Sequence, residues 1–177
     1  MTMWGALLER NPKRVLAAAA LTTRPYIEYG SSPFPMAWLA AMAHLLAGRD
    51  NLARLEWQTA EAVLRERLRE HPEAQFEQAQ LAVTLAWLGR TDEAARLVVP
   101  IEAVARERTN WSLAHMLAIY HTALGDASRA VPYLRLMLNR SAYLTDHTLR
   151  LDPLWDKLRG QSEFEALLTD PKNAAPW

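Results

Sequence analysis

Hydrophobic residues recur at helical spacing on both sides of Gly89, within the stretch from Glu73 to Val104. Before the glycine, Leu81, Leu85 and Leu88 share one helical face. After it, a second apolar face is formed by Ala94, Leu97, Val98, Ile101 and Ala105. The glycine ends one helix, and the acidic residues that follow suit the positive end of the next. This stretch predicts two amphipathic helices joined by a tight turn, and neither helix can bury its apolar stripe alone.

The same scheme occurs once before and once after this stretch. Gly48 separates an apolar run from a long amphipathic segment, and Gly125 separates two further apolar segments. The pattern therefore predicts two more helix pairs, spanning Met36 to Ala47 with Asp50 to Glu70, and Trp111 to Leu124 with Ala127 to Leu138. Five residues after each turn glycine stands an alanine (Ala53, Ala94, Ala130), which favours close helix packing.

The segments at the two ends differ from this scheme. Residues 1–32 predict an N-terminal helical extension, in which Asn11 and Pro12 form a good helix start. The segment from Tyr26 to Pro35 is rich in turn formers and is predicted to be a loop. Residues 144–177 predict a cap and tail with two short helices, the second opened by a capping box of Ser162 and Glu165. We therefore expect one all-α domain over 1–177, with three helix pairs in 33–143.

Two motifs resemble tetratricopeptide repeats (TPRs). LGRTDEAARLV and LGDASRAVPYL are similar to the turn and second helix of such repeats, and the similarity covers Phe34 to Ala142. The large aromatic residue frequent early in the first helix is absent at Ala37, Gln78 and Ala114, so the chain is TPR-like. LRLDPLWDKLRG and FEALL resemble the end of the C-terminal TPR regions of bacterial serine/threonine kinases and winged-helix regulators. The resemblance implies an α-solenoid with capping helices that serves in protein contact or signalling.

The resemblance also implies a concave surface lined by the first helix of each pair. Registering the repeats on their turn glycines places seven side chains towards that surface: Trp38, Met42, Phe76, Val83, Trp87, His115 and Ile119. Such an aromatic and apolar groove suits a peptide or helix. The sequence leaves an alternative open, in which these residues pack against the chain's own end segments and fill the groove.

Composition narrows the function classes. The 177 residues carry a formal net charge of zero, which argues against nucleic acid or an anionic membrane as the main partner. There is no cysteine, and the five histidines form no pair with metal-ligand spacing, so we predict no metal and no cofactor. No apolar run is long enough to span a bilayer. We expect a cytoplasmic protein.

The leading hypothesis is thus a non-catalytic module that binds a protein or peptide partner in the concave groove. A regulatory sensor that holds a small molecule or signalling peptide there is the second hypothesis, and a polar, charged pocket would favour it. An enzyme of unrecognised type would require polar groups that converge in a cleft. Association of two copies through exposed apolar helix faces is a further alternative.

Overall fold

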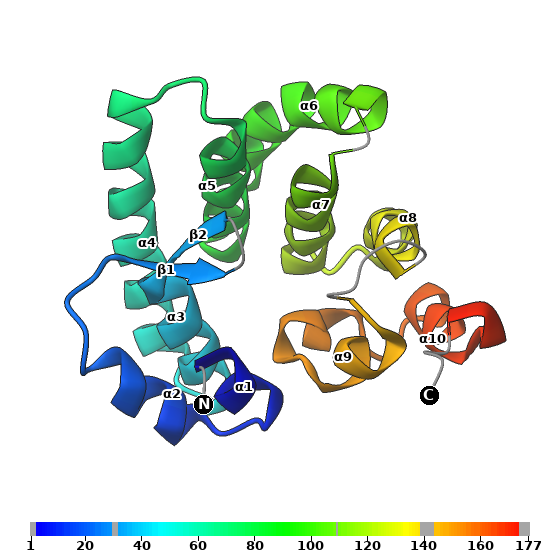
Figure 1. The fold of residues 1–177 in the computed structure, drawn as a ribbon, viewed down its shortest axis with the longest axis horizontal. Coiled ribbons are helices and arrows are strands. Elements are labelled where there is room, and N and C mark those ends of the chain that lie inside the picture. Colours follow the sequence, from blue (N-terminus) through cyan, green and yellow to red (C-terminus); the bar gives the residue numbers. More distant parts are fainter. Residues whose placement is uncertain (1–2, 30–31, 109, 139–143, 174–177) are drawn as a thin grey trace.

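The computed structural model describes residues 3–29, 32–108, 110–138 and 144–173, and 78% of the chain is helical (Figure 1). The helices pack in sequence order. They are α1 (Met3–Leu8), α2 (Pro12–Ala19), α3 (Met36–Leu46), α4 (Asp50–Glu70), α5 (Gln75–Trp87), α6 (Thr91–Arg108), α7 (Trp111–Ala123), α8 (Ala127–Leu138), α9 (Asp146–Leu151) and α10 (Ser162–Thr169), with two 3-10 helices, η1 (Pro153–Leu158) and η2 (Pro171–Asn173). Within the described residues, no helix is both long and apolar enough to cross a membrane.

The three predicted helix pairs are present as α3–α4, α5–α6 and α7–α8. Each pair turns at a glycine with positive φ, which is +65° at Gly48, +80° at Gly89 and +72° at Gly125. A Cβ at any of these positions would meet no atom within 4 Å, so glycine is required by backbone conformation rather than by space. After Gly89, the Arg90 amide donates to the Leu85 carbonyl at 2.9 Å, and the other two turns repeat this bond. The shared bond is the one that ends many helices at a left-handed residue.

Burial separates the pairs into inner and outer helices. Helices α5 and α7 are buried on nearly all sides, whereas α4 buries only the stripe Ala53, Trp57, Ala60 and Leu64. The alanines after the turns, Ala53, Ala94 and Ala130, are all buried, as the pattern predicts for close helix contacts.

Residues 26–29 and 32–35 form two paired β-strands, where the sequence predicted a loop. Strands β1 (Tyr26–Tyr29) and β2 (Ser32–Pro35) pair antiparallel, with Ile27 opposite Phe34. Phe34 is buried and meets the rings of Trp38 and Phe76 edge-on, with centroids 5.6 Å and 5.8 Å away. The prolines suggested a loop, but a two-stranded hairpin tolerates proline at its edges, and the aromatic residues stabilise the strands by packing.

Of the two short helices expected in the C-terminal segment, one begins at the expected residue and the other does not. Asp152 caps η1 by accepting the Leu154 amide at 2.9 Å. The capping box predicted at Ser162 is wrong: Gln161 occupies the cap position of α10 without a side-chain cap bond. The Glu165 carboxylate instead accepts the Gly160 amide at 2.9 Å, one residue beyond the cap.

The two ends of the chain meet beside the helix pairs. The Arg10 guanidinium donates to both carboxylate oxygens of Asp156, at 3.0 Å and 2.6 Å. Helix α1 packs on α3, and η1 packs on both α3 and α7. Figure 1 shows α1 and α9 near one another below the central helices. This arrangement brings both end segments to the face that the first helices of the pairs share.

Candidate functional site

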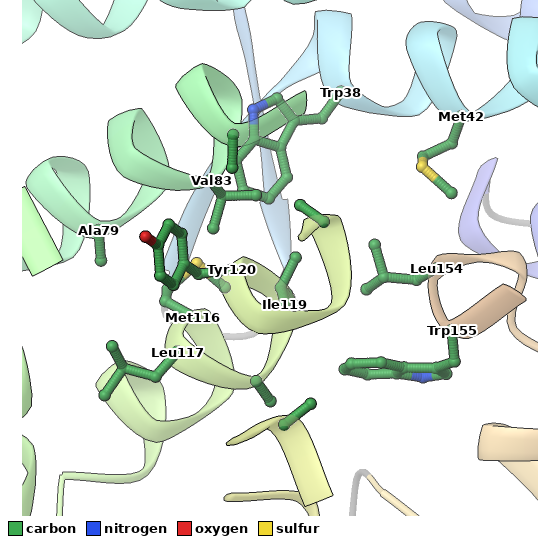
Figure 2. Close-up of a cluster of buried hydrophobic side chains, with 14 of the residues drawn as sticks. Trp38, Met42, Ala79, Val83, Met116, Leu117, Ile119, Tyr120, Leu154 and Trp155 are labelled. Atoms are coloured by element: carbon green, nitrogen blue, oxygen red, sulfur yellow. The ribbon is translucent and has the colours of Figure 1, made fainter. Parts of the chain in front are cut away.

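The seven residues predicted to line a concave groove lie on α3, α5 and α7, and within the described structure only Phe76 lines one of the open hollows reported below. Trp38, Met42, Val83 and Ile119 are buried, whereas Phe76, Trp87 and His115 are partly buried. In Figure 2, Met42 and Ile119 point towards the same region as Leu154 from the C-terminal segment. Of the two alternatives that the sequence left open, the structure has the filled groove.

Both ends of the chain contribute to this filling. Leu154 and Trp155 of η1 and Leu7 of α1 are buried. A residual cavity of about 20 Å³ remains between the end segments and α3 and α7, and Met42 and Ile119 are among its lining residues. A void of that size holds about one water molecule and no peptide.

Asp152 is the one ionisable residue that lines this small cavity. Its burial raises the pKa of the carboxyl to about 6, although the hydrogen bond from the Leu154 amide acts in the opposite direction. The neighbouring Asp156, which pairs with Arg10 and Arg159, has a pKa below its usual range, because the ion pairs outweigh burial there. Asp152 therefore gives this part of the closed face a sensitivity to pH.

Trp87 is covered by a side chain from the C-terminal segment. One face of its indole stacks on Trp57, with ring centroids 5.5 Å apart and an interplanar angle of 3°. The Lys157 ammonium lies 4.0 Å from the Trp87 ring centroid and donates to the Ala123 carbonyl at 2.7 Å. Burial lowers the pKa of Lys157. The cation–π contact and the hydrogen bond together hold η1 against the ends of α5 and α7.

His115 also contacts the C-terminal segment. Its imidazole lies 6.1 Å from the Trp155 ring, and burial lowers the pKa of His115 to about 4. A second histidine, His121, is buried against Tyr120 and Tyr133, with its Nε2 atom 3.4 Å from a Glu102 carboxylate oxygen. No group of three or more His, Cys, Asp or Glu residues that could hold a metal ion occurs in the described part of the chain.

An open hollow lies elsewhere, on the outer side of the first helix pair. We call it the α2–α4 groove, because α2 and α4 form its walls and α3 its floor. Its cavity volume is about 490 Å³. The lining residues are Leu16, Ala19, Ala20, Thr22, Thr23, Arg24, Pro25, Met36, Ala37, Ala40, Glu56, Thr59 and Val63.

The α2–α4 groove combines an apolar floor with a few polar groups. Ala37 and Ala40 are the floor, and their short side chains leave space above α3. The groove has one cation, Arg24, and one carboxylate, Glu56, among its lining residues. Leu21 and Leu55 are each next in sequence to a lining residue, and they are 89% and 57% exposed.

This groove was not predicted from the sequence. Only Val15 of α2 is buried, so the alanines at 17–20 are not part of the core. The leucines Leu52 and Leu55, exposed on the amphipathic α4, were the one signal of an apolar surface there.

A smaller hollow of about 250 Å³ lies between β2 and the starts of α5 and α7. It is more polar than the α2–α4 groove and is lined by Pro33, Gln75, Phe76, Glu77, Asn110, Ser112 and Leu113. The Glu77 carboxylate is already paired with the Arg67 guanidinium at 2.6 Å. Phe76 is thus the one predicted binding residue that borders an open hollow in the described structure.

Comparison with known proteins gives no further assignment: no protein-family model, no curated protein and no solved structure matches the chain.

Proposed function

We propose that the chain is a non-catalytic, TPR-like interaction module that binds a peptide or helix of a partner protein in the α2–α4 groove. Three helix pairs with the same glycine turn and the same buried alanine support a short solenoid. One observation carries the choice of surface: the face expected to be concave is filled by the chain's own ends, whereas the α2–α4 groove is open and holds about 490 Å³.

The chemistry of the groove favours binding over catalysis. Its lining is mostly alanine, leucine, methionine, valine and threonine, with a single carboxylate and a single guanidinium. No histidine, lysine or serine that could act as a nucleophile or proton carrier is among the lining residues. A mainly apolar hollow with two charged groups instead suits recognition of an apolar segment in a fixed orientation.

Peptide display on the full chain tests this proposal. Peptides selected on the wild type should bind Thr59→Arg at least tenfold more weakly, because Thr59 lines the groove and the longer charged side chain occupies it. The matched control is Gln58→Arg, the adjacent exposed residue of α4, which does not line the groove and should leave the dissociation constant within about twofold. Circular dichroism checks that both variants fold. Peptides that bind Thr59→Arg as tightly as the wild type would show that the partner surface lies elsewhere.

A specific observation favours a second candidate function, the sensing of a small molecule. The hollow between β2, α5 and α7 is polar, which is the feature that a sensor requires. A thermal-shift screen with small amino acids and organic acids tests it, with Ser112→Trp as the variant that fills the hollow. A ligand that stabilises the wild type and not the variant supports sensing, and equal stabilisation of both proteins contradicts it.

A further inference from the structure

The gaps between successive outer helices are filled in two cases and open in the third. Arg65 and Arg90 both pair with Glu61 and with Glu93, which joins α4, the turn at Gly89 and α6 in a closed ring of four charges. Between α6 and α8, His121 bridges by its contacts with Glu102 and Tyr133.

The equivalent gap between α2 and α4 is the α2–α4 groove, which is open and holds about 490 Å³. Figure 1 shows α2 below the long helix α4, separated from its upper turns. The groove is therefore the position in the series where packing is incomplete.

The dimensions of this gap suit one helix. The wall on α4 runs from Glu56 to Val63, which corresponds to about 10 Å or two helical turns. The floor residues Ala37 and Ala40 are one turn apart on α3, and their side chains are single methyl groups. Small residues at a helix contact allow the axes to approach to about 8 Å. A helix laid here would contact α2, α3 and α4 together, as the inner helices contact their neighbours.

The two charges of the groove lie towards opposite ends of it. Glu56 lies on the α4 wall one turn before Thr59. Arg24 is at the other end, because its neighbour Pro25 accepts the Met36 amide at 2.8 Å, and the Tyr26 hydroxyl donates to the Val63 carbonyl at 3.4 Å. Neither the Glu56 carboxylate nor the Arg24 guanidinium forms an ion pair with another described residue. An occupant that desolvates both groups has to supply an opposite charge to each.

We propose that the partner is an amphipathic helix with an apolar stripe flanked by one basic and one acidic side chain, about two turns apart. The basic side chain pairs with Glu56 and the acidic one with Arg24, while the apolar residues between them cover Ala37, Ala40 and Val63. This inference rests on the proposed function, and it adds the secondary structure and the charge pattern of the partner.

A charge-reversal experiment on helical peptides tests the inference. The probes are three-turn peptides selected from a helical display library on the wild-type chain. They should be enriched in one basic and one acidic residue about seven positions apart, and Glu56→Lys should weaken their binding at least tenfold. Replacing the peptide's basic residue by glutamate should restore binding to Glu56→Lys and weaken binding to the wild type. The matched control is Glu66→Lys, an exposed position on the same helix outside the groove, which should change affinity less than twofold.

Other outcomes separate the two proposals. Peptides that are lost with Thr59→Arg but bind Glu56→Lys unchanged, or that show no paired charges, overturn the inference and leave the groove as the binding surface. Peptides insensitive to Thr59→Arg, or no binding peptide at all, overturn both. Sedimentation velocity adds one more arm: a wild-type dimer that Thr59→Arg dissociates would mean that a second copy occupies the groove, which also overturns the inference.

Discussion

Replacing Leu154 by alanine should destabilise the whole domain, because η1 is part of its core and not a detachable cover. Leu154 is 5% exposed and points towards Met42 and Ile119 on α3 and α7 (Figure 2). The change removes three buried carbon atoms, which costs roughly 2–3 kcal/mol in transfer free energy. It also enlarges the 20 Å³ cavity that Leu154 already lines, so we expect a total loss of about 3–4 kcal/mol in the free energy of unfolding.

Urea denaturation followed by both circular dichroism and tryptophan fluorescence measures this loss. The control is Leu151→Ala, three residues earlier, where the side chain is 38% exposed and the expected cost is less than about 1 kcal/mol. Helix content reports on all pairs, whereas fluorescence includes Trp155, which is buried in η1 itself. The two signals should change together at one urea concentration.

Two results would refute this reasoning. If Leu154→Ala cost no more than the control, the contacts of Leu154 with α3 and α7 would contribute nothing to stability. If the fluorescence changed at lower urea than the helix signal, η1 would release separately from the helix pairs. The second result would make the face around Trp38 and Met42 accessible to a partner after η1 releases.

Two further predictions concern the same closed face. Asp152 is neutral when folded below its raised pKa of about 6 but ionises near 3.8 when unfolded, so it stabilises the fold fully below pH 4 and loses this effect as pH rises through 6. The free energy of unfolding of Asp152→Asn should therefore rise by about 3 kcal/mol relative to that of the wild type as the pH increases from 4 to 7. If urea denaturation gave a constant difference between the two proteins across that range, the raised pKa of Asp152 would be contradicted. Lys157→Met should cost about 2 kcal/mol by losing the bond to the Ala123 carbonyl and the contact with Trp87. A double-mutant cycle with Trp87→Leu should show coupling of about 1 kcal/mol, and additive losses would refute the contact.

The helix pairs could be predicted from the sequence because their determinants are local. The positive φ at Gly48, Gly89 and Gly125 depends on the absence of a side chain, and the apolar spacing on either side specifies which faces are buried. The pairing of β1 with β2 could not be predicted in this way. Phe34 is held there by Trp38 and by Phe76, and the second of these contacts is remote in the sequence.

The direction of the inner side chains was also predictable, but the groups that cover them were not. Registering the repeats placed Trp38, Met42, Val83 and Ile119 on one face, and they do lie on the inner side of their helices. Three of them, Trp38, Met42 and Ile119, line a small cavity together with Asp152 and Leu154, and no local pattern marks that C-terminal segment as their partner. Helical spacing defines an apolar face and does not distinguish a face that binds another protein from one that binds the chain's own end.

The α2–α4 groove shows the converse problem. Alanine is compatible with a buried contact, an exposed helix and the floor of a hollow, so the alanines of α2 and α3 carried no preference among these. Glu56 was equally ambiguous, because a carboxylate on an outer helix is ordinarily a solvated group or half of an ion pair. Only the positions of all three helices show that Ala40 lies below an unfilled space and that Glu56 borders it without an ion pair in the described structure. Whether a surface is open depends on which packing partners are absent in the folded chain. A sequence pattern shows only which environments a residue tolerates.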